Sequence, residues 1–325
     1  MTYHRQPWKV DPAEWLPIDE LGDFAARAVG CQRRQLMVRQ LRDGSFLTVP
    51  AAVMSDGCNG PWLVLVSGQH GNEWNGPWIL HRLINRLNPE KVRGTIVILP
   101  IANPMAFNEG RRASLVDSID LNRTYGGRPP RKPTEHLGAI LWDSVFSRAD
   151  YLIDLHSGGP GEYLPFASAV NGKELALART LNLRYIHTPG RTKSGFLVDT
   201  CQQTGIRAIL VEVGGGHSLD TQYHPVVLGG LVNFMQAVGI LEGKPVPGPE
   251  PYVFGCKDVV PAPCAGFYQP AVQLGQFVQA GDSLGVITAL LSEEGIGIPS
   301  PRAGIVLYLR KEPVVGEQDS LAHIV

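Results

Sequence analysis

The stretch "PWLVLVSGQHGNEWNGPWIL", residues 61–80, joins a strand pattern to a helix pattern through a polar turn. Residues 61–68 form an apolar run that ends in glycine, which is typical of a strand buried on both faces. Residues 76–88 then show helical spacing. Between the two patterns, His70 and Glu73 stand three residues apart, where the helix should begin. An imidazole and a carboxylate are thus predicted close together at the end of a buried strand.

Strand and helix patterns alternate on both sides of this stretch. This alternation predicts an α/β fold whose strands are parallel and joined by crossover helices. Pro133 is followed by Thr134, which is a candidate N-cap for the third predicted helix, 134–148. The predicted strands are 36–60, 61–68, 94–104, 150–159 and 207–216, and the predicted helices are 21–29, 76–88, 134–148, 173–183 and 226–241.

The pattern changes after residues 244–251, "KPVPGPEP", whose density of proline and glycine marks a linker. Short strands and turns follow, and "DSLGVI" (282–287) resembles "DSLAHI" (319–324). We therefore expect two domains, a catalytic domain over residues 1–245 and a small all-β barrel or sandwich over residues 252–325.

The composition is that of a globular protein. The 325 residues are 44% hydrophobic and 18% charged, with a net charge of −1 and no block of like charge, which argues against nucleic acid or an anionic membrane surface as a partner. No apolar stretch has the length of a membrane span, and the first residues show no signal peptide. Five scattered cysteines are consistent with free thiols. We expect a cytoplasmic protein.

Polar groups follow three of the predicted strands. His70 and Glu73 follow the first, His156 ends the apolar part of "DLHSGG" (154–159), and Glu212 lies in "VEVGGG" (211–216). Ligands of open α/β sheets bind outside the carboxyl ends of the strands. Two histidines and one carboxylate form a known ligand set for catalytic zinc, which leaves Glu212 as a general base.

Each signal has an ordinary structural explanation when it is taken alone. A single HxxE spacing occurs by chance, and a histidine after a strand is more often a hydrogen-bonded structural residue. The combination on independent strands favours the metal site. Asp154 stands two residues before His156, on the same strand face, so it either orients that imidazole or has a structural role.

Four motifs in this order resemble the succinylglutamate desuccinylase and aspartoacylase family, a branch of the zinc carboxypeptidase-like fold. They are "HGNEWNGP" (70–77), "NPMAFNEGRRASLVDSIDLNRTYGG" (103–127), "DLHSGG" and "VEVGGG". The resemblance runs from about residue 45 to the end of the chain. It implies a mixed sheet flanked by helices, followed by a small C-terminal all-β domain.

The resemblance also implies the roles of the site residues. His70, Glu73 and His156 would bind one Zn²⁺ ion per chain, and Glu212 would be the general base and proton shuttle. Asn122 and Arg123 would bind the carboxylate of the substrate. Tyr125 would either line the substrate pocket or have a packing role alone.

An arginine of "GRRAS" (110–114) would stabilise the oxyanion. Arg112 matches the family pattern better, and Arg111 is the alternative, because Leu115 replaces the usual proline beside this motif. A second departure is Asn72, where the family commonly has an acid.

The activity implied is hydrolysis of a small N-acylated amino acid, in the style of the bacterial N-acetyl-diaminobutyrate deacetylases. The acyl group and the amino acid are not predicted, because loops set the pocket. The resemblance alone leads us to expect a homo-oligomer. The alternatives are a metallocarboxypeptidase that acts on peptides, a metal-binding protein without catalysis, and a lipoyl-like carrier. Against the carrier, no lysine lies between Lys257 and Lys311 to take the attachment.

Overall fold

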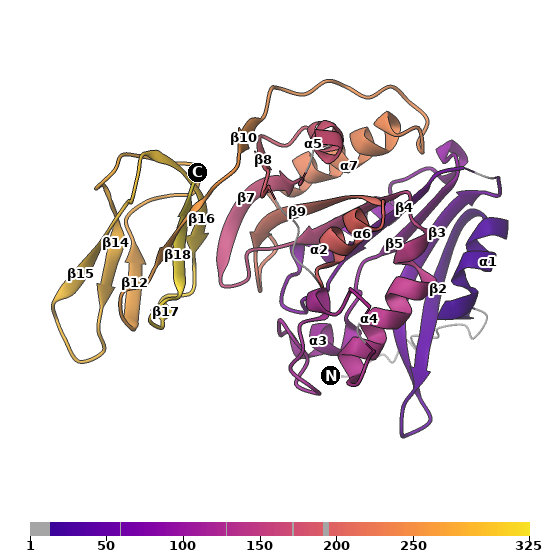
Figure 1. Cartoon of the computed structure of the whole chain (residues 1–325), viewed down its shortest axis with the longest axis horizontal. Helices are drawn as coiled ribbons and strands as arrows, with labels where there is room; N and C mark the ends of the chain where they lie inside the picture. Colours follow the sequence, from indigo (N-terminus) through magenta and orange to yellow (C-terminus); the bar gives the residue numbers. More distant parts are fainter. Residues whose placement is uncertain (1–13, 59, 128, 171, 191–194) are drawn as a thin grey trace, which may run out of the picture.

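The computed structural model describes residues 14–58, 60–127, 129–170, 172–190 and 195–325. A large mixed sheet is flanked by helices, and a strand-rich C-terminal part stands at one end (Figure 1). The expected fold class is confirmed. The strands of the main part are β1 (Trp15–Pro17), β2 (Val29–Gln40), β3 (Phe46–Asp56), β4 (Trp62–Ser67), β5 (Thr95–Leu99), β6 (Tyr151–His156), β7 (Gly161–Ser168), β8 (Tyr185–His187) and β9 (Arg207–Gly215).

The middle of the sheet is built from parallel strands, and three short parallel pairs lie outside it, β1 with β2, β7 with β8 and β8 with β10 (Tyr252–Phe254). Strands β5, β4, β6 and β9 are parallel neighbours in that order. The prediction of parallel strands is wrong on both flanks, because β3 is antiparallel to β2 and β5, and β7 is antiparallel to β9. The reason is clear for β2 and β3: the turn 41–45 is too short for a crossover, so it can only join antiparallel strands.

Helices cover both faces of the sheet, as alternation along the buried strands requires. Leu63 and Leu65 face the core beneath α2, α5 and α7, whereas Val64 and Val66 face the core beneath α1, α4 and α6. The helices are α1 (Leu21–Arg27), α2 (Asn75–Ile84), α3 (Pro104–Glu109), α4 (Pro133–Ser144), α5 (Gly172–Arg179), α6 (Leu197–Gln203) and α7 (His224–Ala237), with short 3₁₀ turns η2 (Ile18–Glu20), η3 (Pro89–Lys91), η4 (Leu121–Arg123) and η5 (Phe146–Arg148).

The predicted N-cap of α4 is wrong. Thr134 lies inside the helix, where its backbone N–H and its hydroxyl both donate to the Asp117 carboxylate. The residue before the helix is Lys132, whose N–H donates to Glu135 at 2.9 Å.

The C-terminal part extends the main sheet and adds a second one. Strand β16 pairs with β7 and with β18, which in turn pairs with β11, while β15, β14, β12 and β17 form a separate antiparallel sheet. Strand β10 pairs with β8. The bounds of these strands are β10 (Tyr252–Phe254), β11 (Asp258–Pro261), β12 (Gly266–Pro270), β13 (Phe277–Val278), β14 (Ser283–Thr288), β15 (Gly295–Pro299), β16 (Gly304–Arg310), β17 (Val314–Val315) and β18 (Ser320–Ile324).

Among the described residues, none of the helices combines the length and apolarity needed to cross a membrane.

Candidate functional site

Three of the predicted side chains meet at the carboxyl ends of β4 and β6. His156 is the last residue of β6, and His70 and Glu73 lie in the loop between β4 and α2. The two strands are parallel neighbours, so this loop opens directly beside His156. One ligand atom from each residue lies within 4.8 Å of the others, and all three residues are buried.

Two glycines allow the loop after β4 to take this path. Gly68 has a φ of 63°, in the left-handed region that favours glycine, and turns the chain at the end of the strand. Gly71 packs so closely on the backbone of Ala106 that a Cβ would have no room, and its N–H donates to the Arg111 carbonyl at 2.8 Å. The loop that carries His70 and Glu73 is therefore fixed against α3.

The ring nitrogens of both histidines have a defined arrangement. Nδ1 of His70 lies 2.8 Å from Oε1 of Glu73, Nδ1 of His156 lies 3.0 Å from Oε2, and the two Nδ1 atoms are 3.2 Å apart. The Nε2 atoms face carboxylates outside the cluster, that of His70 at 3.0 Å from Asp120 and that of His156 at 2.9 Å from Asp154. The predicted orienting contact of Asp154 is confirmed. With Nε2–H donating outward, each Nδ1 presents its lone pair to the centre of the cluster.

These donors fit a divalent metal ion. Two imidazole lone pairs and a carboxylate converge on one point, which is the ligand chemistry of a catalytic zinc site with an open position. Burial would raise the pKa of Glu73, but the two imidazoles outweigh it and hold that pKa well below its usual range. The Glu73 side chain is therefore anionic at neutral pH, as a metal ligand would need to be.

Glu212 lies beside this cluster without belonging to it. It stands in β9 directly opposite His156 of β6 in the parallel register. In the described part of the chain, its Oε2 is buried and has no hydrogen-bond partner. Burial raises the pKa of Glu212 to about 7, and the Glu73 carboxylate acts in the same direction. A carboxyl group of this kind can both accept and return a proton near neutral pH.

Asp120 is a central residue of the site that the sequence patterns did not single out. Its carboxylate accepts from His70 Nε2 at 3.0 Å, from Arg112 Nη2 at 2.8 Å and from Arg123 Nε at 3.1 Å. Burial would raise the pKa of Asp120, but His70 and Arg112 hold it well below its usual range. Its place directly before "LNR", between the two arginine motifs, is the signal that could have identified it.

A cavity of about 230 Å³ opens over the cluster and Glu212. Arg112 and Asn122 both line it, and Arg112 reaches to 3.7 Å from Glu73. Nδ2 of Asn122 lies 3.1 Å from Nε2 of His156, and its Oδ1 accepts from the Leu197 N–H at 2.9 Å. Arg111, the alternative to Arg112, is exposed and is not among the described residues that line this cavity.

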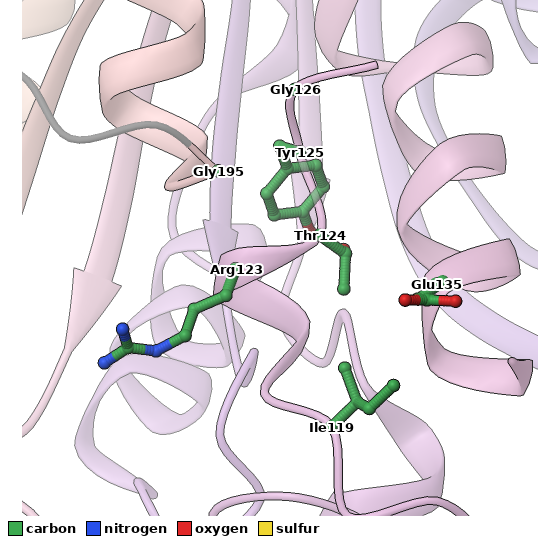
Figure 2. Close-up of a pocket in the computed structure, with 7 residues that line it drawn as sticks. All are labelled: Ile119, Arg123, Thr124, Tyr125, Gly126, Glu135 and Gly195. Atoms are coloured by element: carbon green, nitrogen blue, oxygen red, sulfur yellow. The ribbon is translucent and has the colours of Figure 1, made fainter. Parts of the chain in front are cut away.

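Arg123 and Tyr125 line a neighbouring cavity of about 190 Å³, together with Glu135 (Figure 2). Figure 2 shows the guanidinium of Arg123 extended away from Glu135, and the same group lies 4.9 Å from the centre of the Phe196 ring. Tyr125 is buried against Phe146, with ring centres 5.7 Å apart. Tyr125 thus packs in the core and also borders this neighbouring cavity, but it is not among the described residues that line the cavity over the metal cluster.

Comparison with known proteins points in the same direction. The sequence model described as the succinylglutamate desuccinylase/aspartoacylase catalytic domain matches residues 59–238. A relative from Halomonas elongata, named N-alpha-acetyl-L-2,4-diaminobutyric acid deacetylase, is 29% identical over 295 residues, which cover 85% of this chain and 84% of the relative.

Solved structures agree with this match. The product-bound ectoine utilization protein EutE (DoeB) from Ruegeria pomeroyi has a TM-score of 0.83 at 26% identity, over 91% of this chain and 95% of that chain. The succinylglutamate desuccinylase/aspartoacylase from Rhodobacter sphaeroides has a TM-score of 0.81 at 22% identity, over 91% and 96% of the two chains, which shows a shared fold.

The family match spans more than half of the chain and includes every residue of the cluster, as well as Glu212. It confirms the family that the four motifs indicate. The chain belongs to the succinylglutamate desuccinylase/aspartoacylase family, whose relatives named above as deacetylase, desuccinylase and aspartoacylase are enzymes that hydrolyse amide bonds.

Proposed function

We propose that this protein hydrolyses the amide bond of a small N-acylated amino acid, with one zinc ion per chain held by His70, Glu73 and His156. The observation that carries the proposal is the buried cluster of two Nδ1 atoms and a carboxylate beside Glu212, whose Oε2 has no partner among the described residues. The cavity of about 230 Å³ suits a small substrate. We also propose that residues 1–245 are the catalytic domain and residues 252–325 an accessory β domain.

The chemistry divides among the groups that line the cavity and Arg123, which lines the neighbouring one. A zinc ion, when bound, polarises the scissile carbonyl and lowers the pKa of water. Glu212 takes a proton from the attacking water and returns it to the leaving nitrogen, which its pKa of about 7 permits. Arg112 stabilises the negative charge that develops on the carbonyl oxygen. Asn122 and Arg123 bind the substrate carboxylate and so place the amide over the cluster.

The substrate that we propose first is an N-acetylated amino acid such as N-acetyl-2,4-diaminobutyrate, because the relative from Halomonas elongata is named as a deacetylase of that compound. The test combines metal analysis of the purified protein with release of free amine from N-acetyl and N-succinyl amino acids. One zinc per chain and chelator-sensitive release would support the proposal. Turnover of peptides in place of the N-acyl amino acids would favour a carboxypeptidase instead, and a chain that binds no metal would contradict the site.

The adjacent arginines 111 and 112 provide a matched pair of variants. Arg112→Ala should lower kcat by about a hundredfold, which is typical of losing one group that stabilises an oxyanion. Arg111→Ala should leave kcat within about twofold, because Arg111 is an exposed residue that is not among the described residues lining the cavity over the cluster. Steady-state kinetics on the same N-acetyl substrate measure both. The opposite ranking would assign the oxyanion role to Arg111.

Arg123 should act on binding more than on chemistry. Arg123→Ala should raise KM by about tenfold to a hundredfold, which corresponds to losing a charge-assisted contact to a carboxylate. A substrate whose carboxylate is replaced by a carboxamide should bind equally weakly to the wild-type protein and to the variant. If the variant discriminates between acid and amide as the wild type does, Arg123 does not bind the carboxylate.

A further inference from the structure

Tyr163 connects the cavity to the C-terminal domain. It lines the cavity over the metal cluster and is itself buried. Its strand, β7, runs between β9, which carries Glu212, and β16 of the C-terminal part. Tyr163 stands opposite Gly214 on one side and opposite Tyr308 on the other. One tyrosine therefore touches both the reactive cavity and the accessory domain.

Residues from beyond the linker hold the hydroxyl of Tyr163. Its oxygen lies 2.9 Å from Nδ1 of His323 and accepts from Nζ of Lys257 at 3.3 Å, and Nε2 of His323 lies 2.9 Å from the Ser320 hydroxyl. Burial, with Lys257 nearby, lowers the pKa of His323 to about 3, so its ring is neutral at physiological pH.

The donors and acceptors of this chain can be assigned. A lysine ammonium only donates, so Tyr163 uses its own proton toward Nδ1 of His323. Nε2–H of His323 then donates to Ser320. The hydroxyl of Tyr163 is therefore held by two groups of the C-terminal part.

The ring is also fixed by packing. Its centre lies 4.8 Å from that of Tyr308 and 5.4 Å from that of His323, and the last two rings stack on each other at 4.6 Å. Tyr163 and Tyr308 belong to one buried apolar cluster that spans both parts of the chain. A substitution at His323 should therefore change how firmly the ring of Tyr163 is held in place.

The walls of the cavity differ in chemistry. Besides the metal cluster and Glu212, the side chains suited to the oxyanion and to a carboxylate are Arg112 and Asn122. Asn122 also lines a second cavity of about 160 Å³, which shares Phe196 and Leu210 with the first and can receive the amino acid side chain. The remaining wall, residues 157–160 and Tyr163, carries no charged side chain. It is the part of the cavity left for the uncharged acyl group.

We infer that Tyr163 is the residue that limits the size of the acyl group, and that the C-terminal domain sets its position through His323 and Lys257. The inference rests on the proposed hydrolysis of N-acyl amino acids. A domain that lacks an attachment lysine between Lys257 and Lys311 then acts by shaping the substrate pocket.

The test compares kcat/KM for N-acetyl and N-hexanoyl derivatives of one amino acid on the same preparation, so the fraction of active protein cancels. Wild type should prefer acetyl. Tyr163→Ala should lower this preference by at least about tenfold, since a few methylenes in an apolar pocket carry discrimination of that size. His323→Ala should lower it by about threefold, because the ring remains but is less firmly held. If Tyr163→Ala does not fold, Tyr163→Leu makes the same test with a smaller loss of core volume.

Lys311→Met is the matched control. Lys311 forms an ion pair with Glu162 at 3.1 Å across the same junction but is not among the described residues that line the metal cavity, so the preference should not change. An unchanged preference in active Tyr163→Ala or Tyr163→Leu would overturn the role of the tyrosine. If the preference falls in the Tyr163 variants but not in His323→Ala, the C-terminal domain does not position the tyrosine.

Binding of the two ligands is also measured by calorimetry in a Glu212→Gln background, with the same variants. This separates the two proposals. Binding without hydrolysis by wild type would contradict the proposed function, while the binding preference would still decide the role of Tyr163. If neither ligand binds, both proposals are wrong.

Discussion

Glu212→Gln should lower kcat for an N-acyl amino acid by at least about a hundredfold, in the range that general acid–base catalysis contributes. The substitution keeps the shape of the side chain but removes its ability to take a proton. Zinc should remain bound at one ion per chain, because Glu212 is not part of the cluster of His70, Glu73 and His156. Metal analysis and kinetics on the same sample measure the two quantities together.

Glu162→Gln is the control for this experiment. Glu162 is another buried carboxylate, on β7, and it accepts from the Tyr223 hydroxyl at 2.9 Å. Glu162 lines a different cavity, so the kcat of the Glu162→Gln variant should stay within about twofold of the wild-type value. If Glu212→Gln keeps both zinc and turnover, another group is the base. If it loses zinc, Glu212 is a ligand of the metal.

Much of the candidate metal cluster could be predicted because His70, Glu73 and His156 all stand at the ends of apolar strands. The carboxyl ends of β4, β6 and β9 meet at one edge of a sheet, so His70, His156 and Glu212 converge once these strands are neighbours. Asp120 has no such marker. It reaches His70 from the position just before the 3₁₀ turn η4, in a loop whose course depends on tertiary contacts such as that of Gly71 with Arg111.

The direction of strand pairing was less predictable for a physical reason. An apolar run shows that a strand is buried but does not identify its partner. The antiparallel pairing of β7 with β16 joins residues such as Tyr163 and Tyr308, which are far apart in the sequence. The same long-range contact explains why Tyr163 was not a candidate, since its partner His323 lies two residues from the end of the chain.

Removal of the metal should abolish hydrolysis and lower the thermal stability of the protein, and added zinc should restore both. A ligand that binds only the folded chain stabilises it by about 4 kcal/mol when its free concentration is a thousand times its Kd. The buried cluster brings together groups that the unfolded chain keeps apart in sequence, such as His70 and His156. Differential scanning calorimetry with and without chelator, beside the release assay, measures the two effects.

Two histidine variants decide whether the effect of zinc belongs to this cluster. His156→Ala should lose the zinc-dependent increase in Tm and the activity together, because a donor is removed from the centre of the site. His81→Ala should keep both, since His81 is exposed on α2 and stacks on Trp78. A Tm increase that survives in His156→Ala would show that zinc stabilises the protein from another place. A chelated wild type that still hydrolyses its substrate would exclude the metal from the reaction and leave Glu212 and Arg112 to account for it.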